Sequence, residues 1–240
     1  DAQLVTDKVW HELAFGLESL GYDNGYIRRR VAEMCSFFGL SGIFHRKVAE
    51  LSGGQKQMVN LASVMALSPE VLILDEPTSQ LDPIAASDFL NTVRKINLEL
   101  GTTVILTEHR LEDIFPYADR AVVMDGGRIL ADDTPSRVGQ LLFARNHPMF
   151  TAMPTPVRVF YGAGCSGESP LTVRQGRSWL SREFPEAPEK NTVPAPTLPE
   201  EVKNPVLVLK ELWFRYEKNS PDILRGVSAE VPAGSLYAIL

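Results

Sequence analysis

Apolar residues recur at helical spacing through the first third of the 240-residue chain. Four residues of "VWHELAFGLESL" share one helical face: Val9, Leu13, Leu17 and Leu20. A second face is formed in "GYIRRRVAEMCSFFGL" by Ile27, Val31, Met34, Phe37 and Phe38. A third helix follows "LSGGQ" (51–55), and we expect it to end before Ser68-Pro69. The pattern predicts three amphipathic helices before residue 68.

After residue 70 the pattern changes to that of short buried strands. "VLIL" (71–74) is a continuous apolar run, which predicts a strand buried on both faces. Asp82-Pro83 predicts a helix start, and Gly101 is expected to end that helix. "TTVILT" (102–107) predicts a second buried strand. A strand–helix–strand unit of this kind makes its two strands parallel.

The remaining segments carry weaker signals. We expect a short helix over 111–117, a hairpin around Gly126-Gly127 and a helix over 135–142. Residues 185–205 hold six of the 17 prolines and predict a linker. "VLVLKELWFRY" and "ILRGVSAEVPAGSLYAIL" then predict the opening strands of a second domain.

Composition narrows the function classes. A net charge of -6 argues against a nucleic-acid partner and against a polybasic membrane patch. No apolar run approaches the roughly 20 residues that span a bilayer. Cys35 and Cys165 lie far apart, without metal-ligand spacing, which favours a reducing compartment.

Acidic residues and a histidine follow the two predicted strands. Asp75-Glu76 leaves the first strand and Glu108-His109 leaves the second, at the edge where open α/β sheets bind ligands. One carboxylate can hold Mg²⁺ while the other orients an attacking water, and the histidine can stabilise a developing phosphate charge. The same residues could equally be a turn cap, a solvated acid and a surface histidine.

The segment "SGGQ" adds a candidate anion site. Ser52 occupies an N-cap position, and Gly53-Gly54 would let backbone N–H groups approach an anion at a helix start. Taken alone, the segment could be no more than a helix entry.

Taken together, these segments resemble the ATPases of ABC transporters. "LSGGQ" (51–55), "VLILDEPTSQLD" (71–82) and "TEH" (107–109) correspond to the signature, the Walker B and D-loop segment, and the H-loop. "DAQLVTDKVWHELAFGLESLG" and "PLTVRQGRSWL" (170–180) resemble the energy-coupling-factor branch, whose tandem members carry two ATPase domains on one chain.

The resemblance implies a partial α/β P-loop NTPase fold of the ABC ATPase type. It comprises a parallel-sheet core and a helical signature subdomain, then a linker and the opening strands of a second ABC domain. Residues 1–144 would form the C-terminal part of the first ABC domain, helical over about 4–67 and an α/β core over about 68–144. Residues 145–204 would be a connecting region and proline-rich linker, and residues 205–240 would be the first strands of the second domain.

The resemblance also implies a role for each matching residue. Glu76 and His109 would be catalytic, polarising the attacking water and contacting the γ-phosphate, and Asp75 would help hold Mg²⁺. Asp82 would lie at the interface between the two ATPase domains, or serve only as a helix cap. Four residues would face the γ-phosphate of ATP bound to the opposite domain: Ser52, Gly53, Gly54 and Gln55. Tyr216 would stack on adenine, unless it is a half-buried strand tyrosine.

The implied function is ATP hydrolysis that powers an importer of a vitamin or metal ion. Such a subunit lies peripherally on the cytoplasmic face of the membrane. Its partners are a transmembrane subunit, a separate substrate-binding membrane protein and the second ABC domain of the same chain. Residues 4–50 would form much of the surface for the transmembrane subunit.

The alternative is a soluble tandem ABC ATPase that acts on ribosomes or DNA. Such proteins join their domains with a long, charged helical linker, whereas 185–205 is rich in proline.

A phosphate-binding Gly-x-x-x-x-Gly-Lys-Ser/Thr loop is missing, because the 240 residues contain no Gly-Lys pair. The resemblance places one such loop before Asp1 and another after Leu240. Gln3 follows the position of the glutamine that links nucleotide to membrane partner in the family.

We therefore expect the 240-residue chain alone not to hydrolyse ATP, since no lysine-bearing loop balances the phosphate charge. Phosphate release in the presence of Mg²⁺ measures this directly, with the Glu76→Gln variant as the background. A wild-type rate that this substitution abolishes would contradict the expectation.

Overall fold

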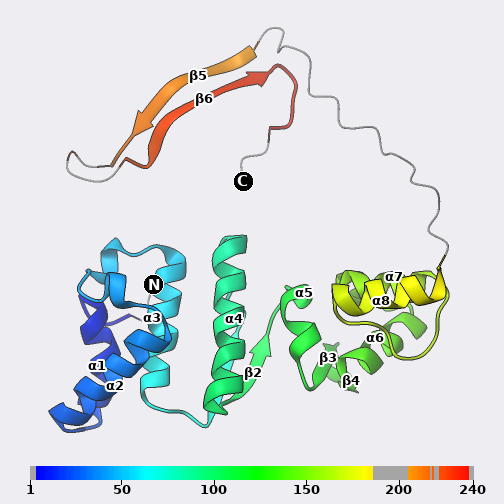
Figure 1. Ribbon diagram of the computed structural model, residues 1–240, viewed down its shortest axis with the longest axis horizontal. Helices are drawn as coiled ribbons and strands as arrows, with labels where there is room; N and C mark the ends of the chain where they lie inside the picture. The colour runs from blue at the N-terminus through cyan, green and yellow to red at the C-terminus, as the bar shows by residue number, and fades with distance from the viewer. Residues whose placement is uncertain (1–3, 186–204, 217, 219–221, 238–240) are drawn as a thin grey trace. The chain divides into compact units, whose positions relative to one another are not determined.

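The computed structural model describes residues 4–185, 205–216, 218 and 222–237, which belong to two compact units, Asp1–Pro185 and Glu186–Leu240 (Figure 1). The helices of the first unit are α1 (Val9–Ser19), α2 (Asn24–Phe37), α3 (Gly53–Ala66), α4 (Pro83–Leu100), α5 (Leu111–Ile114), α6 (Pro135–Ala144), α7 (Thr155–Gly162) and α8 (Val173–Glu183). Its 3-10 turns are η1 (Ser41–Ile43), η2 (Val48–Glu50), η3 (Phe115–Tyr117) and η4 (Pro148–Ala152). Its strands are β1 (Val71–Asp75), β2 (Thr103–Thr107), β3 (Ala121–Asp125) and β4 (Arg128–Asp133), and the second unit holds β5 (Pro205–Phe214) and β6 (Leu224–Pro232). Most of the predicted linker, residues 186–204, lies outside the described residues.

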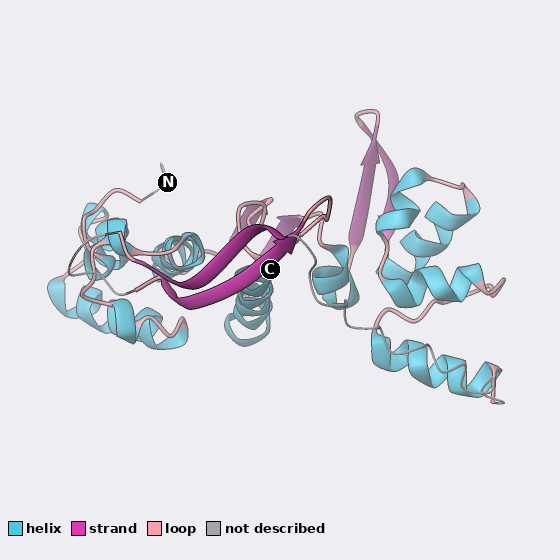
Figure 2. Cartoon of the chain, turned by 90° about the horizontal axis from the view of Figure 1, so that it is seen from above, coloured by secondary structure: helices cyan, strands magenta, loops and turns pink. Residues whose placement is uncertain are grey.

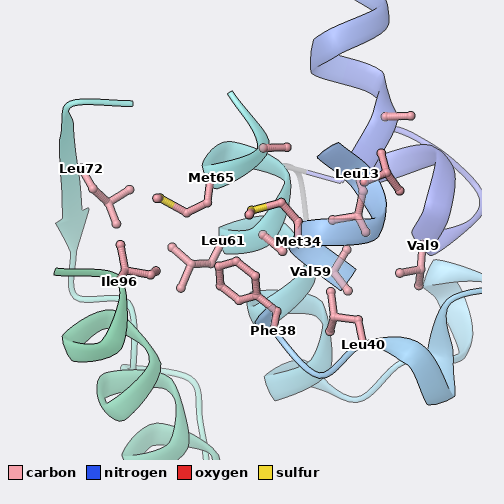
Figure 3. Packing of buried hydrophobic residues seen from close by; sticks show 14 of the residues in the cluster. Val9, Leu13, Met34, Phe38, Leu40, Val59, Leu61, Met65, Leu72 and Ile96 are labelled. Atoms are coloured by element: carbon pink, nitrogen blue, oxygen red, sulfur yellow. The ribbon is translucent and has the colours of Figure 1, made fainter. Parts of the chain in front are cut away.

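The first hydrophobic cluster joins α1, α2 and α3 to β1 and α4 (Figure 3). The three helices predicted from apolar periodicity are confirmed, and their apolar faces meet in this cluster. Leu13, Met65 and Ile96 are among its most deeply buried side chains. Burial of each such side chain contributes roughly 1.5–3 kcal/mol, so the cluster fixes α3 and α4 against β1.

Arg30 of α2 caps the carboxyl end of α3. Its Nε donates to the carbonyl of Ala66 at 3.0 Å, and its Nη2 donates to the carbonyl of Met65 and to Oγ of Ser68, both at 2.8 Å. The last carbonyls of a helix lack intrahelical partners and carry partial negative charge, which a cation stabilises. Arg30 therefore locks α2 to α3 by a contact that apolar periodicity does not predict.

The strand–helix–strand unit is confirmed as β1–α4–β2. The strands are parallel, with Val71 opposite Thr103 and Asp75 opposite Thr107. Oδ1 of Asp82 caps α4 by accepting from the backbone N–H groups of Ile84 at 3.0 Å and Ala85 at 2.9 Å. Gly101 ends the helix in the left-handed conformation, with φ 70°.

The prediction that both strands are buried on two faces is wrong. Leu72 packs into the first cluster and is 5% exposed, whereas Ile73 is 71% and Ile105 is 54% exposed. A continuous apolar run does not specify how many layers cover it. In the part of the chain that the structure describes, Leu72, Leu74, Val104 and Leu106 pack with the first cluster, while Val71, Ile73 and Ile105, which alternate with them, are exposed.

A second hydrophobic cluster joins the β3–β4 hairpin to α6, α7 and α8. Figure 2 shows the backbone of this hairpin with helices beside it. The predicted hairpin turn is confirmed at Gly126 and Gly127, whose φ values are 54° and 74°. Val138, Leu142 and Val157 are fully buried in this cluster. The stretch after residue 145, where periodicity is weak, thus contributes η4, α7 and α8 to a packed core.

Helix α5 and the adjoining turn η3 connect the two clusters. Leu111 and Phe115 pack into the second cluster, while Ile114 packs against the first. Oε1 of Glu112 accepts from the Oγ1 hydroxyl of Thr155 at 2.6 Å and from its backbone N–H at 3.0 Å. These bonds, the hydroxyl bond foremost, lower the pKa of Glu112 below its ordinary value of 4.5.

The second unit contains an antiparallel pair, β5 and β6, which confirms the two predicted strands. Tyr216 lies just beyond the end of β5 and is 79% exposed. Its ring meets the ring of Phe214 edge-on, with 5.1 Å between the centroids. Tyr216 is therefore not the half-buried strand tyrosine of the alternative interpretation, because its side chain is exposed and lies outside β5.

We expect Arg30→Ala to lower the free energy of unfolding by about 2 kcal/mol, because the carbonyls of Met65 and Ala66 lose a charged donor. Chemical denaturation followed by circular dichroism measures the change. Arg29→Ala is the matched control, since Arg29 is its exposed neighbour on α2. Equal stability of the two variants would contradict the capping role.

Candidate functional site

The carboxyl ends of β1 and β2 lie side by side, and hydrogen bonds join them beyond the strand ladder. Thr107, the last residue of β2, donates its hydroxyl to Oδ1 of Asp75 at 2.6 Å. The backbone N–H of Glu76 lies 3.0 Å from the Thr107 hydroxyl oxygen and 3.2 Å from the Thr107 carbonyl oxygen. One threonine therefore fixes the position of both adjacent acids.

Glu76 and His109 meet at this edge. Oε1 of Glu76 lies 3.0 Å from Nε2 of His109, although 33 residues separate them in the chain. The side chains are 50% and 82% exposed, so both reach solvent. The predicted convergence of the acid pair and the histidine is confirmed. The backbone of Glu76 is left-handed, with φ 43°, which is rare for a residue with a side chain.

A second link joins the loops that follow the two strands. Thr78 is 2% exposed and donates its hydroxyl to Oε2 of Glu108 at 2.7 Å. Oε1 of Glu108 accepts from the backbone N–H groups of His109 at 3.0 Å and Arg110 at 3.2 Å. Sequence reasoning assigned no role to Thr78, Thr107 or Glu108. The parallel pairing of the two strands could have indicated these residues, because it places the residues that follow each strand next to one another at the same edge of the sheet.

Ser52 begins α3 as predicted. Its Oγ accepts from the backbone N–H of Gln55 at 3.3 Å, and Oε1 of Gln55 accepts from the backbone N–H of Ser52 at 3.1 Å. This reciprocal capping box engages the side chains of both residues. The Gln55 side chain therefore supports the helix start within its own domain.

The two signature glycines differ in their surroundings. A Cβ added at Gly54 would lie 2.9 Å from the Cβ of Ala85, whereas a Cβ at Gly53 would meet nothing within 4 Å. Gly54 is thus required for the close approach of α3 and α4. At Gly53 the open space leaves the backbone accessible from outside.

A cavity of about 280 Å³ lies between the start of α3 and the loop after β1. Gly53, Asp75 and Glu76 line it together with Gln57, whose Nε2 donates to the carbonyl of Pro77 at 3.1 Å. The structure therefore brings the acid pair and the first signature glycine to one cavity. Asp82 instead caps α4, and Tyr216 belongs to the other unit.

The residues of this edge suit Mg²⁺ bound together with a phosphate group. Asp75 offers a carboxylate, and Mg²⁺ in nucleotide sites typically uses one or two carboxylates plus water and phosphate oxygens. The described residues contain no group of three or more His, Cys, Asp or Glu that could hold a metal without such help. The N-terminal N–H groups of the 14-residue helix α3 suit an anion.

Comparison with known proteins relates the chain to ABC transporters. The ABC transporter family model matches residues 4–79. A Bacillus cereus protein named as an ABC transporter ATP-binding protein is 40% identical over 99% of this chain, and a Methanosarcina mazei protein of the same name is 33% identical over 100%. The chain spans 42% of the length of each of these relatives.

Two solved structures share the fold. The structure of cbiO1 from Clostridium perfringens, described as part of the ABC transporter complex cbiONQ, has a TM-score of 0.55 and 30% identity, covering 68% of this chain and 64% of cbiO1. MJ1267, an ATP-binding cassette of an ABC transporter in its ADP conformation, has a TM-score of 0.52 and 25% identity, covering 63% of each chain.

The first unit therefore carries part of the α/β fold of the ABC ATPases, a class of P-loop NTPase. The family match and the relatives agree with this likeness: the chain is similar to ABC transporter ATP-binding proteins over residues 4–79 and over the 42% of each relative that it spans. Within the part of the chain that the structure describes, no helix is long and apolar enough to cross a membrane.

We expect Gly54→Ala to destabilise the chain by about 1–3 kcal/mol, because the added methyl group overlaps Ala85. Gly53→Ala, the matched control, should leave stability unchanged or raise it slightly, since space is open and alanine favours a helix. Thermal unfolding of both variants tests this. Equal melting temperatures would show that α3 and α4 do not require a glycine at position 54.

Proposed function

We propose that this chain belongs to the ATP-hydrolysing subunit of an energy-coupling-factor importer for a small solute such as a vitamin or metal ion. The observation that carries the proposal is the Glu76–His109 pair beside Asp75 at the carboxyl ends of two parallel strands. The family match supports ATP as the nucleotide, and the carboxylate of Asp75 suits Mg²⁺ as its metal ion. The geometry supplies groups with suitable chemistry at the edge where such sheets bind ligands.

Each residue of the edge has a distinct role in this proposal. Asp75, positioned by Thr107, helps to hold Mg²⁺, which when bound stabilises the charge on the phosphates. Glu76 orients the attacking water, and its Oε1 lies 3.0 Å from Nε2 of His109. His109 is 82% exposed, so it can reach the γ-phosphate. Phosphoryl transfer depends mainly on such positioning and charge stabilisation.

The signature segment would serve the ATP bound to a second ABC domain. The N–H groups of Gly53 and Gly54 lie in the first turn of α3, where helices lack internal acceptors for them. Together with Ser52 and Gln55 they would face the γ-phosphate across the domain interface, beside Asp82. Tyr216 would stack on adenine, and its exposure supports this role.

The transmembrane subunit would dock on α1 and α2. A groove of about 610 Å³ lies there, with Trp10 and Phe44 among its apolar lining and Glu18 and Arg28 among its charged lining. Such a surface suits an amphipathic segment of a membrane partner. The subunit would then lie peripherally on the cytoplasmic face of the membrane, while a separate membrane protein binds the solute. The solved relative cbiO1 is itself described as part of a transporter complex.

The decisive experiment uses the assembled transporter whose ATPase contains these residues, reconstituted in vesicles. Glu76→Gln should lower the rate of ATP hydrolysis by about 10²–10⁴-fold, because the water loses its base, while ATP binding persists. Glu99→Gln, a change of an exposed glutamate on α4, should leave the rate unchanged. Hydrolysis that survives Glu76→Gln would overturn the catalytic assignment. ATP-dependent association with ribosomes or DNA, in place of membrane association, would favour the soluble alternative.

A further inference from the structure

Two reciprocal hydrogen bonds connect the carboxyl ends of β1 and β2 and the loops that follow them. Thr107 of β2 donates to Asp75 of β1, and Thr78, in the loop after β1, donates to Glu108 in the loop after β2. Each strand end with its following loop thus provides one threonine donor and one carboxylate acceptor. The two bonds lie on either side of Glu76 in the first loop. They make the two loops a single cross-linked unit.

Glu108 and Glu76 occupy different environments despite their proximity. Both oxygens of Glu108 are engaged, Oε2 by the hydroxyl of Thr78 and Oε1 by two backbone N–H groups. Its donor Thr78 is almost completely buried. Glu76, by contrast, is half exposed, and its Oε1 faces the ring of His109. The surroundings of Glu108 suit a fixed structural acceptor and not a group that contacts the substrate.

We propose that Glu108 is a positioning residue, whose contact with Thr78 holds His109 opposite Glu76. The inference rests on the proposed function, in which these two residues act on ATP. Glu108 accepts from the backbone N–H of His109 itself, so its carboxylate constrains the backbone at His109, two residues after the end of β2. Thr78 carries that constraint to the loop of Glu76, whose backbone is held in a rare conformation. Without the contact, the 3.0 Å separation between Glu76 and His109 is no longer enforced.

The first test is structural and uses the 240-residue chain. Thr78→Val is a nearly isosteric change that removes the hydroxyl. In this variant the backbone amide hydrogens of His109 and Arg110 should exchange with solvent about tenfold faster, because one hydrogen bond to the charged Glu108 side chain is lost. Amides within β1 and β2 should keep their wild-type exchange rates. Thr78→Ser, which retains the donor, should restore slow exchange. Unchanged exchange at His109 and Arg110 in Thr78→Val would overturn the proposal.

The second test separates positioning from chemistry in the assembled transporter. Thr78→Val and Glu108→Ala should lower kcat for ATP hydrolysis by about 10–100-fold, with KM for ATP within about twofold, because only the geometry of the reacting groups changes. Glu108→Gln should retain most of kcat, since its amide can still accept from the N–H groups and donate to Thr78. Asp113→Ala, an exposed carboxylate on α5, is the control and should match the wild type.

The outcomes of the second test are distinct. A loss of activity in Glu108→Gln as large as in Glu76→Gln would show that Glu108 takes part in the reaction, which overturns a purely positioning role. Wild-type kcat in Thr78→Val would overturn it as well. If the wild-type transporter does not hydrolyse ATP, the proposed function fails, and the amide-exchange experiment alone then decides whether Glu108 positions His109.

Discussion

The parallel pairing of β1 with β2 is the constraint on which the candidate site depends. Their register sets Asp75 opposite Thr107 and brings together two loops that lie about thirty residues apart in sequence. Helix α4 enforces this pairing, because its cap at Asp82 and its end at Gly101 determine where the chain turns back. A shift of one residue in register would turn the Leu72 face away from the first cluster. Packing in the cluster and geometry at the edge therefore support each other.

In the helical part of the first unit, polar contacts at helix ends, and not strand pairing, determine how the elements are positioned. Both ends of α3 are satisfied by specific polar contacts: Arg30 at its end, and the Ser52–Gln55 capping box at its start. These contacts fix the position of α3 along its axis, which apolar packing alone leaves loosely defined. The start of α3 is also the signature segment. Stability and the proposed contact with nucleotide therefore depend on the same few residues.

The sequence was sufficient for the helices and strands up to residue 144, for β5 and β6, and for the meeting of Asp75-Glu76 with His109, because each follows from local periodicity, caps and the parallel rule. It did not predict α7 or α8, where periodicity is weak. It was insufficient for contacts that depend on three-dimensional register. The Thr78–Glu108 bond joins residues 30 positions apart, and neither residue type indicates the other. The burial of β1 was also misjudged, since an apolar run reports hydrophobicity and not the number of layers around it. The roles of the site residues remain predictions.

The left-handed backbone at Glu76 restricts how this position can vary. A replacement must tolerate φ near 43° as well as supply a polar group beside His109. Branched side chains such as valine or isoleucine are strongly disfavoured there on conformational grounds, whereas asparagine, aspartate and glycine fit the backbone but shorten or remove the reach to the histidine. Few residue types therefore meet both requirements at this position. A replacement that fits the backbone better shortens or removes the group that faces His109, so the strained conformation and the contact with the histidine depend on the same residue.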